Sequence, residues 1–329
     1  MRVTITGGTG FIGSRLALRC LAAGQEVTVL GQENTPAEAA NRRLLEAQGA
    51  RVLCGSVTDA ARVAEAVRGA ACVYHLAAAQ HEAHAPQAHF WQVNVEGTRT
   101  VLEASLRAGV GRLVHGSTIG VYGSARQGAL DETSPLQPDN VYGVTKLEGE
   151  RLVLSYCDRL PVVVIRIAET YGPGDRRLLK LFKAIDKGVF CFFGKGDNLH
   201  HPIYIDDLLA GLRRAAEVAP ACGEVFVLAG KEWLTTRQMV QCIADVLGKP
   251  VPRWHLPLWV GNAMAWLGES VMGRVGIKPV IHRRRLDFFK KSFVFSLQKA
   301  NEVLGFFPQW DVKAGMQQTA QWYRERGEL

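Results

Sequence analysis

The sequence predicts an α/β protein with a Rossmann-type doubly wound parallel sheet and a smaller C-terminal α/β substrate cap. Two observations predict this fold. Short β-branched runs alternate with amphipathic helical segments over residues 1–172, and such alternation indicates a parallel sheet with helices on both faces. A glycine-rich turn at residues 7–13 also joins the first β-branched run to the first helical segment.

The glycine-rich turn predicts a dinucleotide site. Gly7, Gly10 and Gly13 are spaced three residues apart. The first permits a sharp turn, the second lets the backbone approach a ligand, and the third lets the helix pack closely on the strand. The N–H groups at the start of the helix, with their partial positive charge, suit a pyrophosphate. The predicted cofactor contacts in this turn also include Phe11 and Ile12.

The remaining elements follow the same alternation up to about residue 172. We expect strands at residues 26–30, 51–54, 72–77, 112–115 and 161–166. Helices are expected at residues 35–49, 58–67, 94–108 and 141–158, the first of them opened by a capping box with proline at its first position. Residues 1–172 therefore form the predicted Rossmann domain.

From about Gly172 onwards the connections become longer, and residues 173–329 form the predicted cap. Helices are expected at residues 178–187, 206–218, 237–247, 297–304 and 312–326, with strands near residue 203 and at 224–229. These two strands are candidates to rejoin the first sheet.

Composition excludes several classes of function. The net charge of +8 comes from scattered basic residues, apart from the runs at 282–285 and 290–291, which favours anionic ligands over nucleic acid. The seven cysteines form no Cys-x-x-Cys pair, which predicts reduced core thiols and no metal site. No apolar run reaches membrane-spanning length, and the chain starts directly with a strand, which leaves no room for a signal peptide. We therefore expect a cytoplasmic protein without a transmembrane segment.

Tyr142 and Lys146 form a candidate catalytic pair. Four residues apart on a predicted helix, they lie on one face. A phenol with its ordinary pKa near 10 acts as a base at neutral pH only if that pKa is lowered, and a neighbouring ammonium lowers it. In the open alternative, Tyr142 is a packing residue and Lys146 a solvated charge. Hydroxyl groups at Ser117 and Thr118 end the fifth strand, at the edge where ligands bind in open α/β sheets.

With these motifs together, the chain resembles the extended short-chain dehydrogenase/reductase superfamily. This is the NAD-dependent epimerase/dehydratase family, and the chain also has features of the 3β-hydroxysteroid-dehydrogenase-like branch. The resemblance covers nearly the whole chain. It rests on residues 6–13, 75–78, 94–98, 117–123, 142–146, 166–174, 204–208 and 299–305.

The resemblance implies roles for individual residues. Tyr142 is the acid/base that moves the proton of a substrate hydroxyl. Lys146 tunes Tyr142 and binds the nicotinamide ribose. Thr118 bonds the reacting oxygen, with Ser117 as a helper at the substrate. Hydride then passes between a carbinol carbon of the substrate and an NAD or NADP nicotinamide.

Further residues are implied around the dinucleotide. Leu76, Ala77 and Ala78 line its cleft, Ile167 contacts it, and Asn94 supports the active-site helix. Members of the superfamily often dimerise through the two helices that carry Asn94 and Tyr142, so the resemblance also implies a homodimer.

On the cofactor side, the chain departs from the family pattern. Gly31 stands where the usual NAD-selecting acid is found. Glu33 is a candidate for the ribose hydroxyls, while Arg42 or Arg43 is a candidate for a 2′-phosphate, so NAD and NADP remain open. Ser56 stands where many members place an aspartate beside the adenine, and a serine can still bond there.

Departures on the substrate side weaken a simple nucleotide-sugar interpretation. Glu169 replaces an asparagine that contacts the substrate in nucleotide-sugar epimerases, and a carboxylate repels a diphosphate unless it is paired. Near His200 and the histidine that follows it, the arginine that clamps the diphosphate is missing. Arg176 and Arg177 can compensate as bidentate phosphate ligands or, alternatively, cap the next helix at the surface.

The apolar stretch at residues 256–272 contains Asn262 and Glu269, which argues against a transmembrane helix. It resembles the hydrophobic cap segment of the steroid-dehydrogenase-like branch. It either walls a lipid-like substrate pocket or packs as a core or dimer helix. The neighbouring basic run at 282–285 is either a solvated face or a contact for anionic headgroups or a substrate phosphate.

Three functions remain open. Epimerase/dehydratase chemistry on a nucleotide sugar leads, because the motifs in the second half follow the sugar-epimerase order. A 3β-hydroxysteroid- or dihydroflavonol-type dehydrogenase/reductase on an apolar substrate is the alternative, since both use Thr118, Tyr142 and Lys146. The third is a non-catalytic dinucleotide sensor, against which the complete catalytic set argues.

Overall fold

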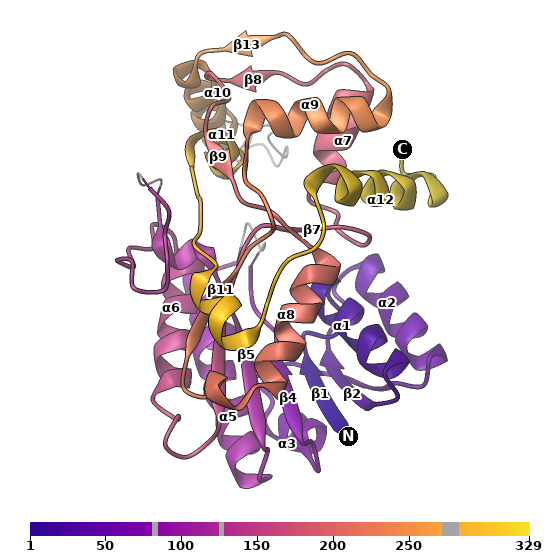
Figure 1. Cartoon of the computed structure of the whole chain (residues 1–329), viewed down its shortest axis with the longest axis vertical. Coiled ribbons are helices and arrows are strands. Elements are labelled where there is room, and N and C mark those ends of the chain that lie inside the picture. The colour runs from indigo at the N-terminus through magenta and orange to yellow at the C-terminus, as the bar shows by residue number, and fades with distance from the viewer. Residues whose placement is uncertain (81–84, 125–127, 272–282) are drawn as a thin grey trace.

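A computed structural model describes residues 1–80, 85–124, 128–271 and 283–329. Its centre is a seven-stranded sheet in the order β11-β6-β5-β4-β1-β2-β3, and every neighbouring pair is parallel (Figure 1). The strands are β1 (Arg2–Thr6), β2 (Glu26–Gly31), β3 (Arg51–Cys54), β4 (Cys72–His75), β5 (Arg112–Thr118), β6 (Val162–Ile167) and β11 (Val225–Leu228). The predicted fold class is confirmed.

Helices cover both faces of the sheet, as the strand–helix alternation requires. One hydrophobic core packs α1 (Phe11–Ala22) against β1 and β2, and the neighbouring α8 (Ile205–Glu217) against β5 and β6. The other core lies beneath α3 (Ala60–Val67), α5 (Gly97–Arg107) and α6 (Val141–Leu154). The helix α2 (Pro36–Ala47) begins with the predicted capping box, in which Thr35 accepts from the Glu38 backbone and Glu38 from the Thr35 backbone.

The helix expected at residues 94–108 is longer and less regular than its sequence suggests. It begins with α4 (Gln87–Trp91), passes through the π-helical turn η1 (Gln92–Glu96) and continues as α5. The π-helical turn contains Asn94, whose side-chain amide donates to the Thr145 hydroxyl on α6. The first helical position of this segment is therefore well before the predicted start.

The second half of the chain contributes to both parts of the molecule. The strand expected at 224–229 rejoins the main sheet as β11, beside β6. The strand expected near 203 does not; as β10 (Ile203–Tyr204) it pairs with β7 (Thr170–Tyr171) in a separate two-stranded sheet. It is too short to extend along β11, because α8 begins at the next residue.

The cap lies above the carboxyl edge of the sheet in Figure 1. Its short strands pair as β9 (Leu199–His200) with β12 (Leu234–Thr235), and as β8 (Phe192–Phe193) with β13 (His255–Leu256). Its helices are α7 (Leu179–Asp186), α9 (Thr236–Leu247), α10 (Leu258–Val271), α11 (Arg283–Lys290) and α12 (Val312–Glu325). The expected helix at 297–304 contains the π-helical turn Ala300–Leu304.

No helix in the part of the chain that the structure describes is both long enough and apolar enough to cross a membrane.

Candidate active site

The glycine turn has the geometry that an approaching pyrophosphate requires. Gly7 adopts φ +68°, and a Cβ on it would lie 2.7 Å from the backbone nitrogen of Ala77. A Cβ on Gly13 would collide with the Gly7 carbonyl, so this glycine is needed for α1 to pack on the turn. Gly10 caps α1 without a side-chain hydrogen bond, and the first turn contains no acidic residue. The start of α1 is therefore suited to an anionic ligand.

After the end of β2, two of the candidates for cofactor selection, Glu33 and Arg42, are bonded to each other. A Cβ on Gly31 would lie 2.7 Å from the Thr9 methyl group, so the neighbouring threonine leaves no room there for an acid. Glu33 pairs with Arg42, which also bonds Glu46 at 2.8 Å. Any contact of Glu33 with a ribose, or of Arg42 with a 2′-phosphate, must therefore rearrange this ion pair.

Ser56 lies in a local turn beside this region. Its hydroxyl is 2.8 Å from the Thr58 hydroxyl and accepts from the Thr58 backbone N–H at 3.2 Å. Both hydrogen bonds join Ser56 to Thr58, two residues away. The contact of Ser56 with an adenine stays a prediction.

Two glycines bring the catalytic candidates together. A Cβ on Gly143 would lie 2.7 Å from the Gly120 carbonyl, so α6 approaches the end of β5 closely only because residue 143 lacks a side chain. This contact places the N-terminal turn of α6, with Tyr142, against the segment that follows Thr118. The Thr118 hydroxyl accepts from the Gly120 backbone at 3.1 Å, which leaves its hydrogen to donate to a substrate oxygen.

Lys146 is buried one turn after Tyr142, with 2 % of its surface exposed. Its Nζ lies 3.4 Å from Nε2 of His115. Burial lowers the pKa of Lys146 to about 8, although the charge of Glu150 acts in the opposite direction. Burial, Lys146 and His75 hold the pKa of His115 well below its ordinary value, so His115 is a neutral acceptor. An ammonium one helical turn from a phenol stabilises the phenolate.

A hydrogen-bond chain connects the dinucleotide side to α6. Thr98 donates to the Asn94 carbonyl at 2.8 Å, so its oxygen accepts from Nε2 of His75 at 2.9 Å. Nδ1 of His75 then accepts from the Thr6 hydroxyl at 2.7 Å. Asn94 bonds both backbone groups of Ala79 and donates to Thr145 on α6. Asn94 thus supports the active-site helix, as the resemblance implies, and the loop at residues 76–79 is fixed from beneath.

Beneath the catalytic pair lies an ion pair that the sequence interpretation missed. Glu150 and Arg166 are both buried, and Arg166 also donates to Tyr122 at 2.9 Å. The Ser117 hydroxyl donates to Glu150 at 2.9 Å and is buried. Ser117 was predicted to contact substrate, but it instead supports this buried cluster. The available signal was spacing, since Glu150 follows Tyr142 and Lys146 at the same four-residue interval.

On the cap side of β6, Glu169 and His200 form a pair. Oε2 of Glu169 is 3.0 Å from Nδ1 of His200, and 42 % of the Glu169 side chain is exposed whereas His200 is buried. Nε2 of His200 is 2.8 Å from the Thr236 hydroxyl. Burial would raise the pKa of Glu169, but His200 and Arg177 together lower it. The Glu169 carboxylate on the substrate side is therefore already paired with His200.

Of the two adjacent arginines, Arg177 is the one closer to the chemistry. Burial would lower its pKa, but Asp175, Glu169 and Tyr142 raise it, which places its charge within reach of the catalytic tyrosine. Arg177 also bonds Asp175 and the Thr170 carbonyl. Arg176, which we predicted as a substrate contact, is half-exposed and bonds Glu328 at 2.7 Å.

Ile167 and Thr118 are register partners on β6 and β5, so Ile167 lies at the same carboxyl edge as the catalytic threonine. Leu76, Ala77 and Ala78 follow β4 at this edge. Among the described residues, no three His, Cys, Asp or Glu side chains cluster as metal ligands would.

Two of the buried histidines, His75 and His115, predict an acid-sensitive fold. Burial and Lys146 lower the pKa of His75 to about 3, so below the ordinary histidine pKa only the unfolded chain takes up this proton. Each histidine should then reduce the free energy of unfolding by about 1.4 kcal/mol per pH unit as the pH falls below about 6.5. Urea unfolding across this range measures the slope. His75→Gln should reduce this slope of unfolding free energy against pH. His255→Ala, at an exposed site, is the control and should leave the slope as it is. A slope that His75→Gln does not change would contradict the role given to His75.

Comparison with known proteins identifies the family. Residues 3–229 match the model of the NAD dependent epimerase/dehydratase family. The chain belongs to this family. Its members are enzymes that use a nicotinamide dinucleotide, and the glycine turn and the uncapped start of α1 provide the site that such a cofactor needs.

The relatives of this NAD-dependent epimerase/dehydratase family member match most or nearly all of the chain. A dTDP-glucose 4,6-dehydratase of Streptomyces niveus is 28 % identical over 99 % of this chain and 93 % of its own. A 4-hydroxy-2-methyl-3-oxo-4-farnesyl-3,4-dihydroquinoline-1-oxide ketoreductase of Stigmatella aurantiaca is 32 % identical over 82 % of this chain and 80 % of its own. The solved structure of DesIV, a dTDP-glucose 4,6-dehydratase of Streptomyces venezuelae with NAD and TYD bound, is 30 % identical, with a TM-score of 0.81 and coverage of 99 % and 98 %.

Proposed function

We propose that this family member moves a hydride between a secondary alcohol or ketone of a nucleotide sugar and NAD(P), as an epimerase/dehydratase-type enzyme. One observation carries the proposal. The close contact of Gly143 with Gly120 brings the first turn of α6, which carries Tyr142, to the segment that follows Thr118 at the end of β5. Nucleotide-sugar dehydratases among the relatives support the substrate class.

The chain's own residues supply the proton chemistry. Thr118 donates to the substrate oxygen, and Tyr142 accepts the hydroxyl proton at its phenolate oxygen. Lys146 stabilises the phenolate and, with Tyr142, holds the nicotinamide ribose. When bound, the nicotinamide supplies the hydride acceptor and, in the reverse direction, the donor. The remaining predicted contacts position the dinucleotide, from Gly7, Gly10, Phe11, Ile12 and Gly13 at the pyrophosphate to Glu33 and Ser56 at the adenosine.

Epimerisation needs the fewest groups in this site. Tyr142 can take the proton in the oxidation and return it after the ketone turns, so one acid/base serves both halves. An elimination also requires groups that remove a carbon-bound proton and protonate a leaving hydroxyl. The three residues between Thr118 and Tyr122 are Ile119, Gly120 and Val121, none of which titrates. The segment after Thr118 therefore supplies neither group, and Glu169 on the substrate side is already paired with His200, which supports epimerisation over dehydration.

A second candidate is a reductase that acts on an apolar ketone. The observation that favours it is Glu169, a carboxylate on the substrate side, where a diphosphate would be repelled. The relative from Stigmatella aurantiaca is named a ketoreductase, which supports ketone reduction as the alternative reaction. In the nucleotide-sugar case, Arg177 beside Glu169 supplies the positive charge that a diphosphate needs.

A thermal-shift screen separates the two candidates. The full chain with NAD or NADP is tested against nucleoside diphosphate sugars and against sterol-like and isoprenoid ketones. We expect a nucleotide sugar to raise the melting temperature, because a ligand that binds only the folded state stabilises it. Stabilisation by the ketones alone, with net consumption of reduced cofactor, would replace the epimerase proposal by the reductase.

Glu169→Gln tests the substrate side. It removes the charge that pairs with His200, and we expect kcat/KM to fall by about tenfold or more with NAD affinity unchanged. Glu217→Gln, in an exposed ion pair on α8, is the matched control and should have no effect. Unchanged kinetics for Glu169→Gln would remove this pair from the substrate site.

We also propose that the enzyme is a cytoplasmic homodimer that pairs through the two helical segments that carry Asn94 and Tyr142. The family resemblance supports this assembly. Light scattering of the full chain gives its mass directly, and a monomer at all concentrations would reject the dimer.

A further inference from the structure

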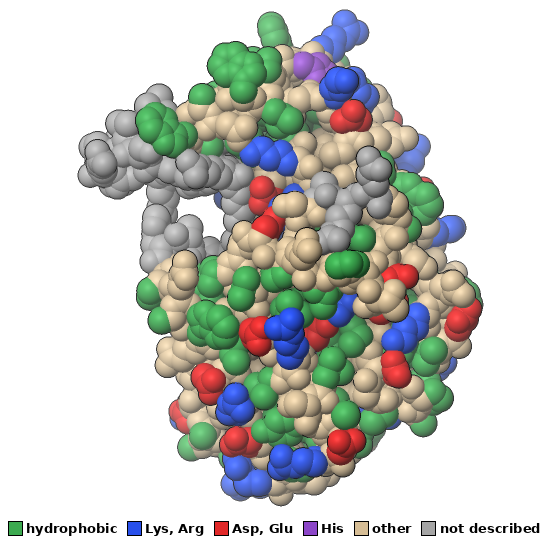
Figure 2. Space-filling model, turned by 90° about the vertical axis from the view of Figure 1, so that its left-hand side faces the viewer, with side chains coloured by type: hydrophobic (Ala, Val, Ile, Leu, Met, Phe, Trp, Pro, Cys, Tyr) green, Lys and Arg blue, Asp and Glu red, His purple; other side chains and the backbone are tan. Residues whose placement is uncertain are grey.

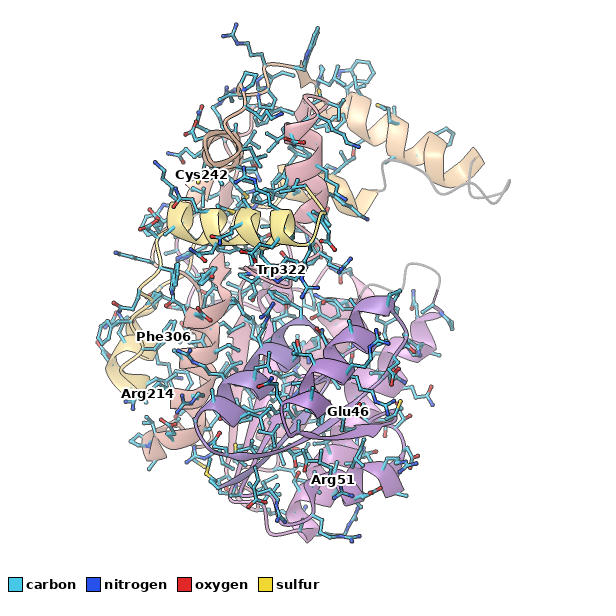
Figure 3. The ribbon with its side chains drawn as sticks, turned by 90° about the vertical axis from the view of Figure 1, so that its right-hand side faces the viewer. Glu46, Arg51, Arg214, Cys242, Phe306 and Trp322 are labelled. Atoms are coloured by element: carbon cyan, nitrogen blue, oxygen red, sulfur yellow. The ribbon has the colours of Figure 1, made fainter. Side chains whose placement is uncertain are left out.

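The upper end of the cap exposes large apolar side chains that nothing in the proposed reaction uses. Trp254 is 75 % exposed, Val189 72 %, Trp259 70 %, Trp266 57 %, Met264 46 % and Leu256 38 %. We call these six residues the cap patch. Val189, Trp254 and Leu256 line a single cavity of about 310 Å³ between the end of α7 and β13. The others lie on α10, which projects from the upper end of the molecule (Figure 3).

The helix α10 packs on its own chain through Gly261, Ala265 and Leu258, and its two tryptophans are exposed. Ala265 is fully buried, and a Cβ on Gly261 would lie 2.7 Å from the Phe193 ring and 2.9 Å from Leu286. Trp259 and Trp266 are two turns apart, on one exposed face. A helix that had only to bury itself against its own chain would place the tryptophans inward. The exposed face is therefore available for a contact outside the chain.

Cationic residues accompany the patch. Arg253 is exposed and directly precedes Trp254, and Arg283, Arg284 and Arg285 begin α11, which packs against α10. In the sequence, residues 249–285 hold seven Lys or Arg and one acidic residue, of which Lys249 pairs with Asp186 and residues 272–282 lie outside the described part of the chain. Figure 2 shows hydrophobic and basic side chains together at the upper end of the molecule.

We propose that the cap patch docks on the surface of an anionic phospholipid bilayer. Tryptophan is the residue that prefers the headgroup level of a membrane, and a basic neighbourhood attracts anionic lipids. A second copy of the chain fits less well, because a two-fold interface would bring two basic segments together. The patch contains none of Thr118, Tyr142 and Lys146, so its variants leave the proposed catalytic residues unchanged. The inference holds for either substrate class.

Vesicle co-sedimentation of the full chain tests the proposal. We expect binding to vesicles of phosphatidylcholine mixed with phosphatidylglycerol to exceed binding to phosphatidylcholine alone by about tenfold or more, and to weaken with salt. Trp259→Ser combined with Trp266→Ser should weaken binding by about tenfold or more. Phe307→Ser, which removes a 60 % exposed ring elsewhere on the surface, is the matched control.

The vesicle test does not depend on the proposed reaction, because none of its measurements uses turnover. Melting temperature and NAD affinity should be the same in all variants, which shows that each is folded. Quenching of native tryptophan fluorescence by brominated phospholipids adds a test that needs no substitution. No preference for anionic vesicles, or equal binding by the double variant, overturns the proposal. A native dimer that the tryptophan variants convert to a monomer would assign the patch to a second copy instead.

Discussion

Tyr142→Phe should reduce turnover by about three orders of magnitude while leaving NAD affinity within a few-fold. The variant removes the only atom of this side chain that can carry the substrate proton, and it retains the ring beside the dinucleotide. Lys146 and the glycine turn, the predicted cofactor contacts, are unchanged. Substrate turnover and a cofactor titration by intrinsic fluorescence measure the two effects separately.

Thr145→Ser is a useful control for Tyr142→Phe, because it retains the hydroxyl that accepts from Asn94 on the same helix. It should have close to native activity. Native turnover by Tyr142→Phe would show that another group moves the proton.

Glu150→Ala should cost the fold about 3–5 kcal/mol, the largest stability effect we expect from one substitution. Both members of the Glu150–Arg166 pair are buried, with side-chain exposures of 2 % and 4 %. Removal of the carboxylate leaves the Arg166 guanidinium buried with Tyr122 and the Glu132 carbonyl as its acceptors. Denaturant unfolding at neutral pH measures the loss.

Two further variants show whether the cost comes from the uncompensated charge. Glu65→Ala breaks ion pairs with Arg51 and Arg62 at the surface and should change stability by about 1 kcal/mol or less. Glu150→Leu combined with Arg166→Met removes both charges and should recover much of the loss. A double variant as unstable as Glu150→Ala would mean that packing, and not charge, is responsible.

The central sheet was predictable because its signals are local. β-branched runs, the capping box at Thr35 and the glycines of the first turn each determine structure over a few residues. The Tyr142–Lys146 pair was predictable for the same reason, since its spacing on one helix is visible in the sequence. The close contact of Gly143 with Gly120 was not, because it depends on how α6 meets β5.

Residues whose role depends on a partner far along the chain were harder to assign. Ser117 was expected at the substrate, yet its partner Glu150, 33 residues away, draws its hydroxyl into the buried cluster. Arg176 and Arg177 are adjacent, and only their partners, Glu328 and Asp175, distinguish them. For the apolar stretch at 256–272, composition was compatible with a core helix, whereas the structure exposes its tryptophans.

The most direct test of the proposed reaction is rapid mixing of the NAD-loaded enzyme with the nucleotide sugar that stabilises it best. We predict that the near-ultraviolet absorbance of reduced nicotinamide rises and then falls as the substrate is oxidised at one carbinol carbon and reduced again. The product should be the epimer, with no net consumption of cofactor, and Tyr142→Phe should give no absorbance change. Formation of epimer without transient reduction of the nicotinamide, or no response to any nucleotide sugar, would contradict the account.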